Sequence, residues 1–124
     1  MTIAARRSTP LPGQAVRGST RGRPLMAALD LLGRRWALRV LWELRDRPLG
    51  FRALQAACDG MSSSVLRDRL RELGEAGLVA RGSDEAYALT PLGADLRRSL
   101  APLGRWAERW EEHLRSAARY GGQP

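Results

Sequence analysis

Arginine and serine side chains gather on one side of a predicted helix between residues 61 and 75. Ser64, Arg67 and Arg71 recur at steps of three and four residues, with mostly apolar residues filling the opposite side. Steps of this size place side chains on one face of an α-helix. Hydroxyl and guanidinium groups on such a face can donate hydrogen bonds to phosphates and to base edges in a DNA major groove. The pattern therefore predicts nucleic-acid recognition.

Few other residues in the chain could support chemistry. The sequence holds one cysteine, Cys58, and one histidine, His113. A single cysteine excludes an internal disulfide and a CxxC redox pair, and one histidine cannot by itself form a metal site or a catalytic dyad. The sequence also lacks a Gly-rich phosphate loop and a Ser/His/Asp set. We therefore expect no enzymatic activity, no metal and no cofactor.

Cys58 is expected to be a small buried hydrophobe, which is the usual environment of a free cysteine. A reactive thiol needs a lowered pKa, and the adjacent carboxylate of Asp59 disfavours the thiolate. The sequence therefore argues against a thiol switch at this position.

The helix that carries the arginines also has an apolar face. Its members are Val65, Leu66, Leu70 and Leu73. Ser62 precedes the helix and can accept a hydrogen bond from the free N–H groups of its first turn, and Gly74 and Gly77 loosen and end it. Two short runs with alternating apolar residues follow, at residues 78–81 and 86–89, on either side of a Gly-Ser-Asp turn. These runs predict a β-hairpin.

Apolar periodicity predicts three shorter helices before this unit, at residues 25–32, 35–45 and 51–57. A short helix, a tight turn and the longer arginine-bearing helix then follow one another, which is typical of a helix-turn-helix. A final helix opens at Pro91, and its apolar stripe runs through residues 92–114 in steps of three and four. The predicted fold is therefore mainly α with a small β-hairpin wing, a winged helix-turn-helix.

The length of the chain sets its expected organisation. With 124 residues it has room for one domain with a modest core. The stripe on the final helix is longer than such a core can cover, which favours a partner subunit. We expect a flexible basic arm at residues 1–24, a DNA-binding and dimerisation domain at 25–119, and a disordered tail at 120–124.

The charge of the chain also points to nucleic acid. The formal net charge is +8, and all 21 basic residues are arginine, which reflects either a GC-rich codon bias or the fit of arginine to phosphate and guanine. The predicted arm holds five arginines and no acid. It could follow phosphates or enter a minor groove, or it could be a basic tail without a fixed site.

The sequence does not predict a membrane partner. No run approaches the roughly 20 apolar residues that a membrane span needs. The first residues also lack the compact apolar stretch of a secretion signal. We therefore expect a cytoplasmic protein.

Several short motifs occur together and in order along the chain. They are ALDLLG at residues 28–33, Trp36, LWEL at 41–44, Phe51-x-x-Leu54, Met61-Ser62, GLV at 77–79, Tyr87-x-Leu89-Thr90-Pro91-x-Gly93 and Trp106. Each motif is weak alone, and jointly they are specific. In these motifs the chain resembles the HxlR type of bacterial winged-helix transcriptional regulators.

The resemblance implies a homodimer, joined through the first and last helices, that binds a palindromic operator and controls neighbouring genes, more often as a repressor. It also implies which residues face double-stranded DNA. These are Ser62, Ser63, Ser64, Arg67 and Arg71 on the recognition helix, with Arg52 near a phosphate. From the residues themselves, Arg34, Arg35 and Arg81 are further candidates for backbone contacts.

The sequence departs from the family pattern at two places. Many members have a redox-sensing cysteine just before the proline that opens the first helix, whereas Arg23 precedes Pro24 here. The turn of the hairpin is short and carries Asp84 and Glu85, which a phosphate backbone would repel. We therefore expect little DNA affinity from the hairpin apart from Arg81.

Two alternatives remain open from the sequence. The four tryptophans, Trp36, Trp42, Trp106 and Trp110, either pack as plain hydrophobes or line a pocket near the dimer interface for a flat aromatic effector. Apart from the effector pocket, the other alternative is that the winged-helix face binds another protein rather than DNA. The basic arm and the arginine face argue against the latter.

Overall fold

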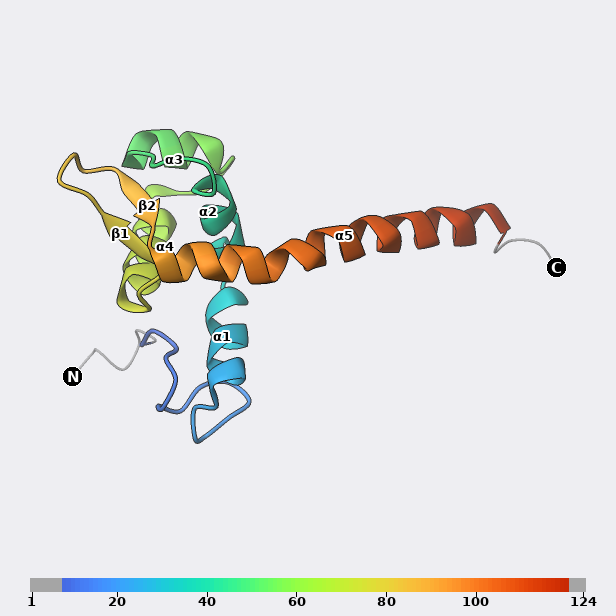
Figure 1. The fold of residues 1–124 in the computed structure, drawn as a ribbon, viewed down its shortest axis with the longest axis horizontal. Coiled ribbons are helices and arrows are strands. Elements are labelled where there is room, and N and C mark those ends of the chain that lie inside the picture. The colour runs from blue at the N-terminus through green and yellow to red at the C-terminus, as the bar shows by residue number, and fades with distance from the viewer. Residues whose placement is uncertain (1–7, 121–124) are drawn as a thin grey trace.

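The chain folds into a small helical body with one long helix that leaves it (Figure 1). The computed structural model describes residues 8–120, so residues 1–7 of the expected arm and 121–124 of the expected tail lie outside the described residues. The elements are α1 (Pro24–Leu32), α2 (Ala37–Glu43), α3 (Phe51–Ala57), α4 (Ser63–Glu75), β1 (Val79–Arg81), β2 (Tyr87–Leu89) and α5 (Pro91–Tyr120). The prediction of a mainly α fold with one β-hairpin is confirmed.

The core lies where α2, α3 and α4 meet. Its largest fully buried side chains are Leu54, Leu66, Leu73, Val40 and Cys58. The predicted apolar face of α4 supplies two of them, and Leu70 is buried beside these. Burial of one leucine side chain stabilises a fold by about 1.5–3 kcal/mol, so this face holds α4 firmly against the body. The opposite face of α4 is thereby left to solvent.

The hairpin is fixed to α3 as well as to α4. The strands β1 and β2 pair antiparallel, with Val79 opposite Leu89 and Arg81 opposite Tyr87. Leu49, just before α3, adds a further bridge: its N–H donates to the Tyr87 carbonyl at 2.9 Å, and the Tyr87 N–H donates to the Leu49 carbonyl at 2.8 Å. The hairpin and the helix-turn-helix therefore form one surface.

The start of α5 is held close to the hairpin. Thr90 caps the helix, since its Oγ1 accepts from the Gly93 N–H at 3.0 Å and donates to the Gly77 carbonyl at 2.6 Å. A Cβ on Gly93 would lie 2.1 Å from the Leu78 carbonyl oxygen, so no larger residue fits at this position. The predicted cap at Thr90 and Pro91 is present.

Beyond this anchor, α5 becomes a long rod that projects from the body (Figure 1). The helix has 30 residues and continues through Pro102. Large apolar side chains on its outer half are exposed, namely Leu103, Trp106, Trp110 and Leu114. No helix within residues 8–120 combines the length and the apolar character needed to cross a membrane.

The second helix is shorter than predicted. It spans Ala37–Glu43 where the sequence predicted residues 35–45. Trp36 has a φ of 76°, the left-handed region that a non-glycine residue rarely adopts. Its side chain packs against the core, so tertiary contacts hold this residue in a tight turn between α1 and α2. Local periodicity contains no signal for such a turn.

Residues 8–23 lie along α1 and α4. Thr9 is buried, and its hydroxyl donates to a carboxylate oxygen of Glu75. The backbone carbonyl of Ser8 accepts from Arg34 at 3.0 Å, and the Arg17 backbone N–H donates to Asp30 at 3.1 Å. These bonds join the described part of the N-terminal segment to the domain, and its predicted flexibility and contact with DNA stay predictions.

Candidate nucleic-acid interface

Four predicted DNA-contacting arginines converge on one hollow between α3, α4 and the hairpin. The hollow has a volume of about 510 Å³ and is lined by Phe51, Arg52, Arg67, Leu70, Arg71, Arg81 and Tyr87. We call it the arginine hollow. It contains residues from three elements that are separated in sequence, and every charged residue that lines it is basic. This is the electrostatic character that a phosphate backbone requires.

Arg67 is the member of the hollow that is best placed for a ligand. Its residue is exposed, and its guanidinium carbon lies 5.0 Å from the centroid of the Phe51 ring. A cation over an aromatic face is attracted by the ring quadrupole, so Phe51 holds the guanidinium without occupying its hydrogen-bond donors. The sequence contains no signal for this contact between Phe51 and Arg67.

Arg71 is paired on its own helix. Its guanidinium lies 4.0 Å from an Asp68 carboxylate oxygen and 3.5 Å from one of Glu75. All three side chains are at least one-third exposed, and exposed ion pairs of this kind contribute only about 0.2–1 kcal/mol. The pairs therefore hold Arg71 in place while leaving it able to exchange a carboxylate for a phosphate.

The hairpin contributes one arginine and one carboxylate to this side of the molecule. Arg81 lies 2.8 Å from a Glu85 carboxylate oxygen, and its guanidinium carbon is 5.3 Å from the centroid of the Tyr87 ring. Glu85 has a φ of 67°, in the tight turn of the hairpin. The carboxylate offsets the charge of Arg81, the hairpin residue expected to contact phosphate, and the weak contribution of the rest of the hairpin stays a prediction.

The three serines occupy the N-terminal end of α4. Ser62 is the N-cap, and its hydroxyl oxygen accepts from the Val65 N–H at 3.2 Å. Its hydroxyl also lies 3.3 Å from that of Ser64. Ser63 lines a second hollow of about 510 Å³, beside the first, together with Phe51, Arg52, Gln55, Ala56 and Arg67. Ser63 thus shares a continuous face with Arg52 and Arg67.

Gln55 on α3 is a polar residue of this face that is not among the predicted contacts. Its side-chain amide donates to the Met61 carbonyl at 3.4 Å, across the turn between α3 and α4. Gln55 lies one turn after Arg52 on α3, and these two polar residues among apolar and small ones were the available signal.

Arg34 and Arg35 lie elsewhere, at the turn between α1 and α2. The Arg34 side chain is 11% exposed, and it lies 2.6 Å from a carboxylate oxygen of the buried Glu72. Arg69 approaches the same carboxylate from α4 at 3.0 Å. Arg34 is therefore engaged inside the protein, and the structure does not bring it or Arg35 to the arginine hollow. The spacing of Arg69 and Glu72 on one helix predicts their pairing, whereas the approach of Arg34 from the α1–α2 turn has no signal in the sequence.

The four tryptophans do not meet in one pocket of the described chain. Trp106 and Trp110 stack on α5 with ring centroids 5.4 Å apart, and Trp36 packs against the core. Trp42 is covered on one face by the guanidinium of Arg45 at 3.9 Å. Trp42 also borders a groove of about 520 Å³ between α2 and α5. Trp106 and Trp110 are not among the residues that line that groove.

Cys58 is fully buried at the end of α3. Burial in the core raises the pKa of its thiol, and the nearby carboxylates of Glu43 and Asp59 act in the same direction. Within residues 8–120, no group of three or more metal-ligating side chains comes together.

Comparison with known proteins identifies the family of this fold. The HxlR-like helix-turn-helix family matches residues 31–115, which span α2, α3, α4, the hairpin and most of α5. The chain is 32% identical over 89 residues to the uncharacterised HTH-type transcriptional regulator YvaP of Bacillus subtilis strain 168, covering 67% of this chain and 82% of that protein. It is also 28% identical over 101 residues to the HTH-type transcriptional regulator YodB of the same organism, covering 77% of this chain and 90% of that protein.

Solved structures agree. The quinone-bound structure of YodB from B. subtilis superposes with a TM-score of 0.65 at 29% identity, over 68% of this chain and 96% of that one. A transcriptional regulator assigned to the MarR family, from Enterococcus faecalis V583, gives a TM-score of 0.65 at 34% identity, over 72% of this chain and 86% of that one. The chain therefore belongs to the HxlR-like family of DNA-binding winged helix-turn-helix transcriptional regulators.

Proposed function

We propose that this chain acts as a homodimer that binds a palindromic operator sequence-specifically and represses transcription. The observation that carries the proposal is the convergence of Arg52, Arg67, Arg71 and Arg81 on one hollow between α3, α4 and the hairpin. In a helix-turn-helix, the second helix enters the major groove, and here that helix is α4.

The proposed contacts divide into base readout and backbone positioning. Arg67 and Arg71 project from the exposed side of α4, where a guanidinium can donate two hydrogen bonds to the O6 and N7 atoms of guanine. Ser62, Ser63 and Ser64 lie at the start of α4, and their hydroxyls are suited to phosphates beside the groove. Arg52 and Arg81 flank α4 and would contact the backbone on either side.

The proposed dimer rests on the apolar surface that one subunit leaves uncovered. Leu103, Trp106, Trp110 and Leu114 on α5 are each about half exposed, and Leu25 and Leu29 on α1 are more than half exposed. Large contiguous apolar surfaces of this kind mark protein interfaces. A two-fold symmetric partner would cover both stripes and would set the separation of the two copies of α4, which must be about 34 Å to engage successive turns of DNA.

The decisive experiment is selection of bound sequences from a random pool of duplex DNA, followed by binding measurements over a range of salt concentrations. We expect an inverted-repeat motif, and a log affinity that falls linearly with log salt concentration. Light scattering on the purified chain should give the mass of a dimer. A chain that stays monomeric, or that binds every duplex equally well, contradicts the proposal.

A second proposal concerns an aromatic effector. The YodB neighbour has a quinone-bound structure, and the groove beside Trp42 has room for a small molecule. Cys58 is buried and Arg23 precedes Pro24, so a non-covalent mode fits this chain better than a thiol adduct. Titration with quinones and related flat compounds should quench tryptophan emission, and an unchanged spectrum contradicts the proposal.

A further inference from the structure

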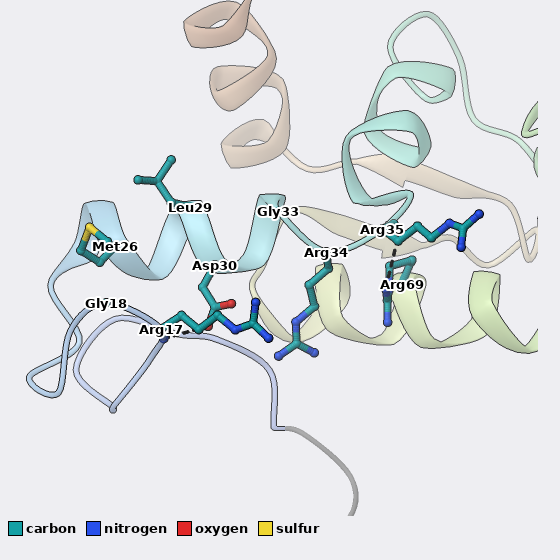
Figure 2. A pocket seen from close by; sticks show the side chains of 9 residues that line it. All are labelled: Arg17, Gly18, Met26, Leu29, Asp30, Gly33, Arg34, Arg35 and Arg69. Atoms are coloured by element: carbon teal, nitrogen blue, oxygen red, sulfur yellow. Dashed lines mark hydrogen bonds between the residues drawn. The ribbon is translucent and has the colours of Figure 1, made fainter.

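The described start of the chain is fastened to the body by hydrogen bonds. We call residues 8–14 the N-terminal strap. The backbone carbonyl of Ser8 accepts from the Arg34 guanidinium at 3.0 Å, and the Gln14 side-chain amide donates to the Thr9 carbonyl at 2.7 Å. Figure 2 shows the Arg34 side chain pointing from the α1–α2 turn toward this segment. The strap is therefore held in a defined position beside α1 and α4.

Thr9 is the residue of the strap that reaches the recognition helix. It is only 4% exposed. Its hydroxyl donates a hydrogen bond to Oε1 of Glu75, the last residue of α4. A hydrogen bond to an ionised carboxylate is stronger than one between neutral groups. The bond therefore fixes the position of the Glu75 carboxylate at the end of α4.

The same carboxylate oxygen faces Arg71. Nη1 of Arg71 lies 3.5 Å from Oε1 of Glu75, whereas strong charged pairs are about 2.7–2.9 Å apart. Arg39 and Glu43 on α2 have the same order and spacing, and they approach to 2.8 Å. Within residues 8–120, Arg39 is the only residue that hydrogen-bonds the Glu43 carboxylate. The looser of the two pairs is thus the one whose carboxylate oxygen already accepts a hydroxyl.

We propose that Thr9 is a positioning residue for Arg71: its bond to Glu75 loosens the ion pair and leaves the Arg71 guanidinium available to DNA. The inference rests on the proposed function, in which Arg71 reads a base. Without the hydroxyl, Glu75 can turn toward Arg71 and close the pair, as Glu43 does with Arg39. DNA would then have to break a closed ion pair before it could bind this arginine.

The rival explanation is that Thr9 only holds the strap in place. Loss of the hydroxyl would then disturb the packing of the strap, and any effect on DNA affinity would not depend on Arg71. Direct contact between Thr9 and DNA is not a third explanation, because Thr9 is buried and does not line the arginine hollow. The two explanations therefore differ in whether the effect of Thr9 requires the Arg71 guanidinium.

The test is a double-mutant cycle on the full-length chain, with affinity for the selected operator measured by fluorescence anisotropy. Thr9→Val removes the hydroxyl and keeps the shape of the side chain, whereas Thr9→Ser keeps the hydroxyl. We expect Thr9→Val to weaken operator binding by about two- to fivefold, which is the range that an exposed ion pair can supply. Thr9→Ser should bind as tightly as the unaltered chain. In the Arg71→Gln background, Thr9→Val should cause no further loss.

The matched background is Arg98→Gln, which removes the same charge from an exposed position on α5. In that background Thr9→Val should weaken operator binding as it does in the unaltered chain. Equal losses from Thr9→Val in the Arg71→Gln and Arg98→Gln backgrounds would overturn the inference and leave the proposed function standing. An equal loss in Thr9→Ser and Thr9→Val, or no loss in Thr9→Val, would overturn it as well.

A second measurement needs no DNA. In the nuclear magnetic resonance spectrum of the isotope-labelled chain, the Nε–H signal of Arg71 can be assigned by its absence from Arg71→Gln. Thr9→Val should shift this signal, because the guanidinium moves closer to Glu75, and Thr9→Ser should leave it in place. An unshifted signal in Thr9→Val would overturn the inference. A shifted signal together with equal binding of all duplexes would confirm the link between Thr9 and Arg71 and would contradict the proposed function instead.

Discussion

At the level of single residues, the surroundings of each guanidinium divide the arginines of this chain by role. Arg34 and Arg69 share the buried carboxylate of Glu72, so both guanidinium groups are paired inside the protein. Arg67 is exposed and rests on the Phe51 ring, which leaves its donors available. Because the side chains are chemically identical, only their partners distinguish a structural arginine from one that can read DNA.

Arg67→Gln tests base recognition. If the guanidinium binds a guanine, the substitution should lower affinity for the selected operator by about 1–3 kcal/mol and relax preference at one base position. Fluorescence anisotropy with the operator and with a scrambled duplex measures both effects, and Arg98→Gln serves as the matched control. An equal loss on both duplexes would assign Arg67 to the phosphate backbone instead.

Cys58 should be inert in the folded protein. Burial raises the pKa of its thiol above the ordinary value of 9.0, so the thiolate needed for alkylation is scarce and enclosed. Folding therefore favours the protonated thiol. The contribution of Cys58 to the free energy of unfolding should be fully present below the thiol pKa of the unfolded chain, and it should be lost as the pH rises through the higher pKa of the folded chain. Iodoacetamide should label the chain in denaturant and leave it unlabelled when folded at pH 8. Rapid labelling of the folded chain would contradict this expectation.

At the level of elements, two local features determine whether α4 is presented correctly. The Ser62 cap begins the helix at the turn after α3, and the cluster of Glu72 with its two arginines fixes the middle of α4 to the α1–α2 turn. The first feature could be read from the sequence, since a hydroxyl before an apolar run is a common helix start. The second joins residues that lie 38 positions apart.

Ser62→Ala should destabilise the fold by about 1 kcal/mol, because the Val65 N–H loses its acceptor. Urea unfolding followed by circular dichroism measures the change. Ser63→Ala is the matched control, since Ser63 begins the helix without serving as its cap. Equal stability of the two variants would show that the cap contributes nothing.

Glu72→Gln should be far more damaging. Glu72 is 2% exposed, and neutralisation of its carboxylate leaves two partly buried guanidinium groups without a counter-charge. Breaking a buried pair in this way costs about 3–5 kcal/mol. The control Glu111→Gln removes an exposed carboxylate that pairs with Arg115, and it should cost less than about 1 kcal/mol. A loss in Glu72→Gln no larger than in the control would contradict the proposed role of the cluster.

At the level of the whole molecule, α5 projects beyond the other helices and the hairpin (Figure 1). Its first turns are anchored by Gly93 against Leu78, whereas the residues after Leu100 pack on no other element closely enough to be buried. A helix of this length with an uncovered apolar stripe gains stability only when a partner covers it. The uncovered stripe on α5 therefore supports the proposed dimer.

Trp110→Glu should weaken the dimer, because a carboxylate would replace an aromatic ring in the proposed interface. The mass from light scattering should fall toward that of a monomer, and operator affinity should fall with it. Arg115→Glu introduces a carboxylate on the polar side of the same helix and should remain dimeric. A Trp110→Glu dimer as stable as the control would exclude this stripe from the interface.

The sequence by itself determined the features that depend on local spacing: the helices, the hairpin, the cap at Ser62 and the arginine face of α4. These follow from side-chain periodicity, which acts over a few residues. Only the tertiary structure decided that Arg52 and Arg81 join Arg67 while Arg34 turns inward to Glu72, and that Trp36 adopts a left-handed turn. Such pairings depend on how distant elements pack, because a charge is neutralised or left available by neighbours that the linear order of residues does not specify.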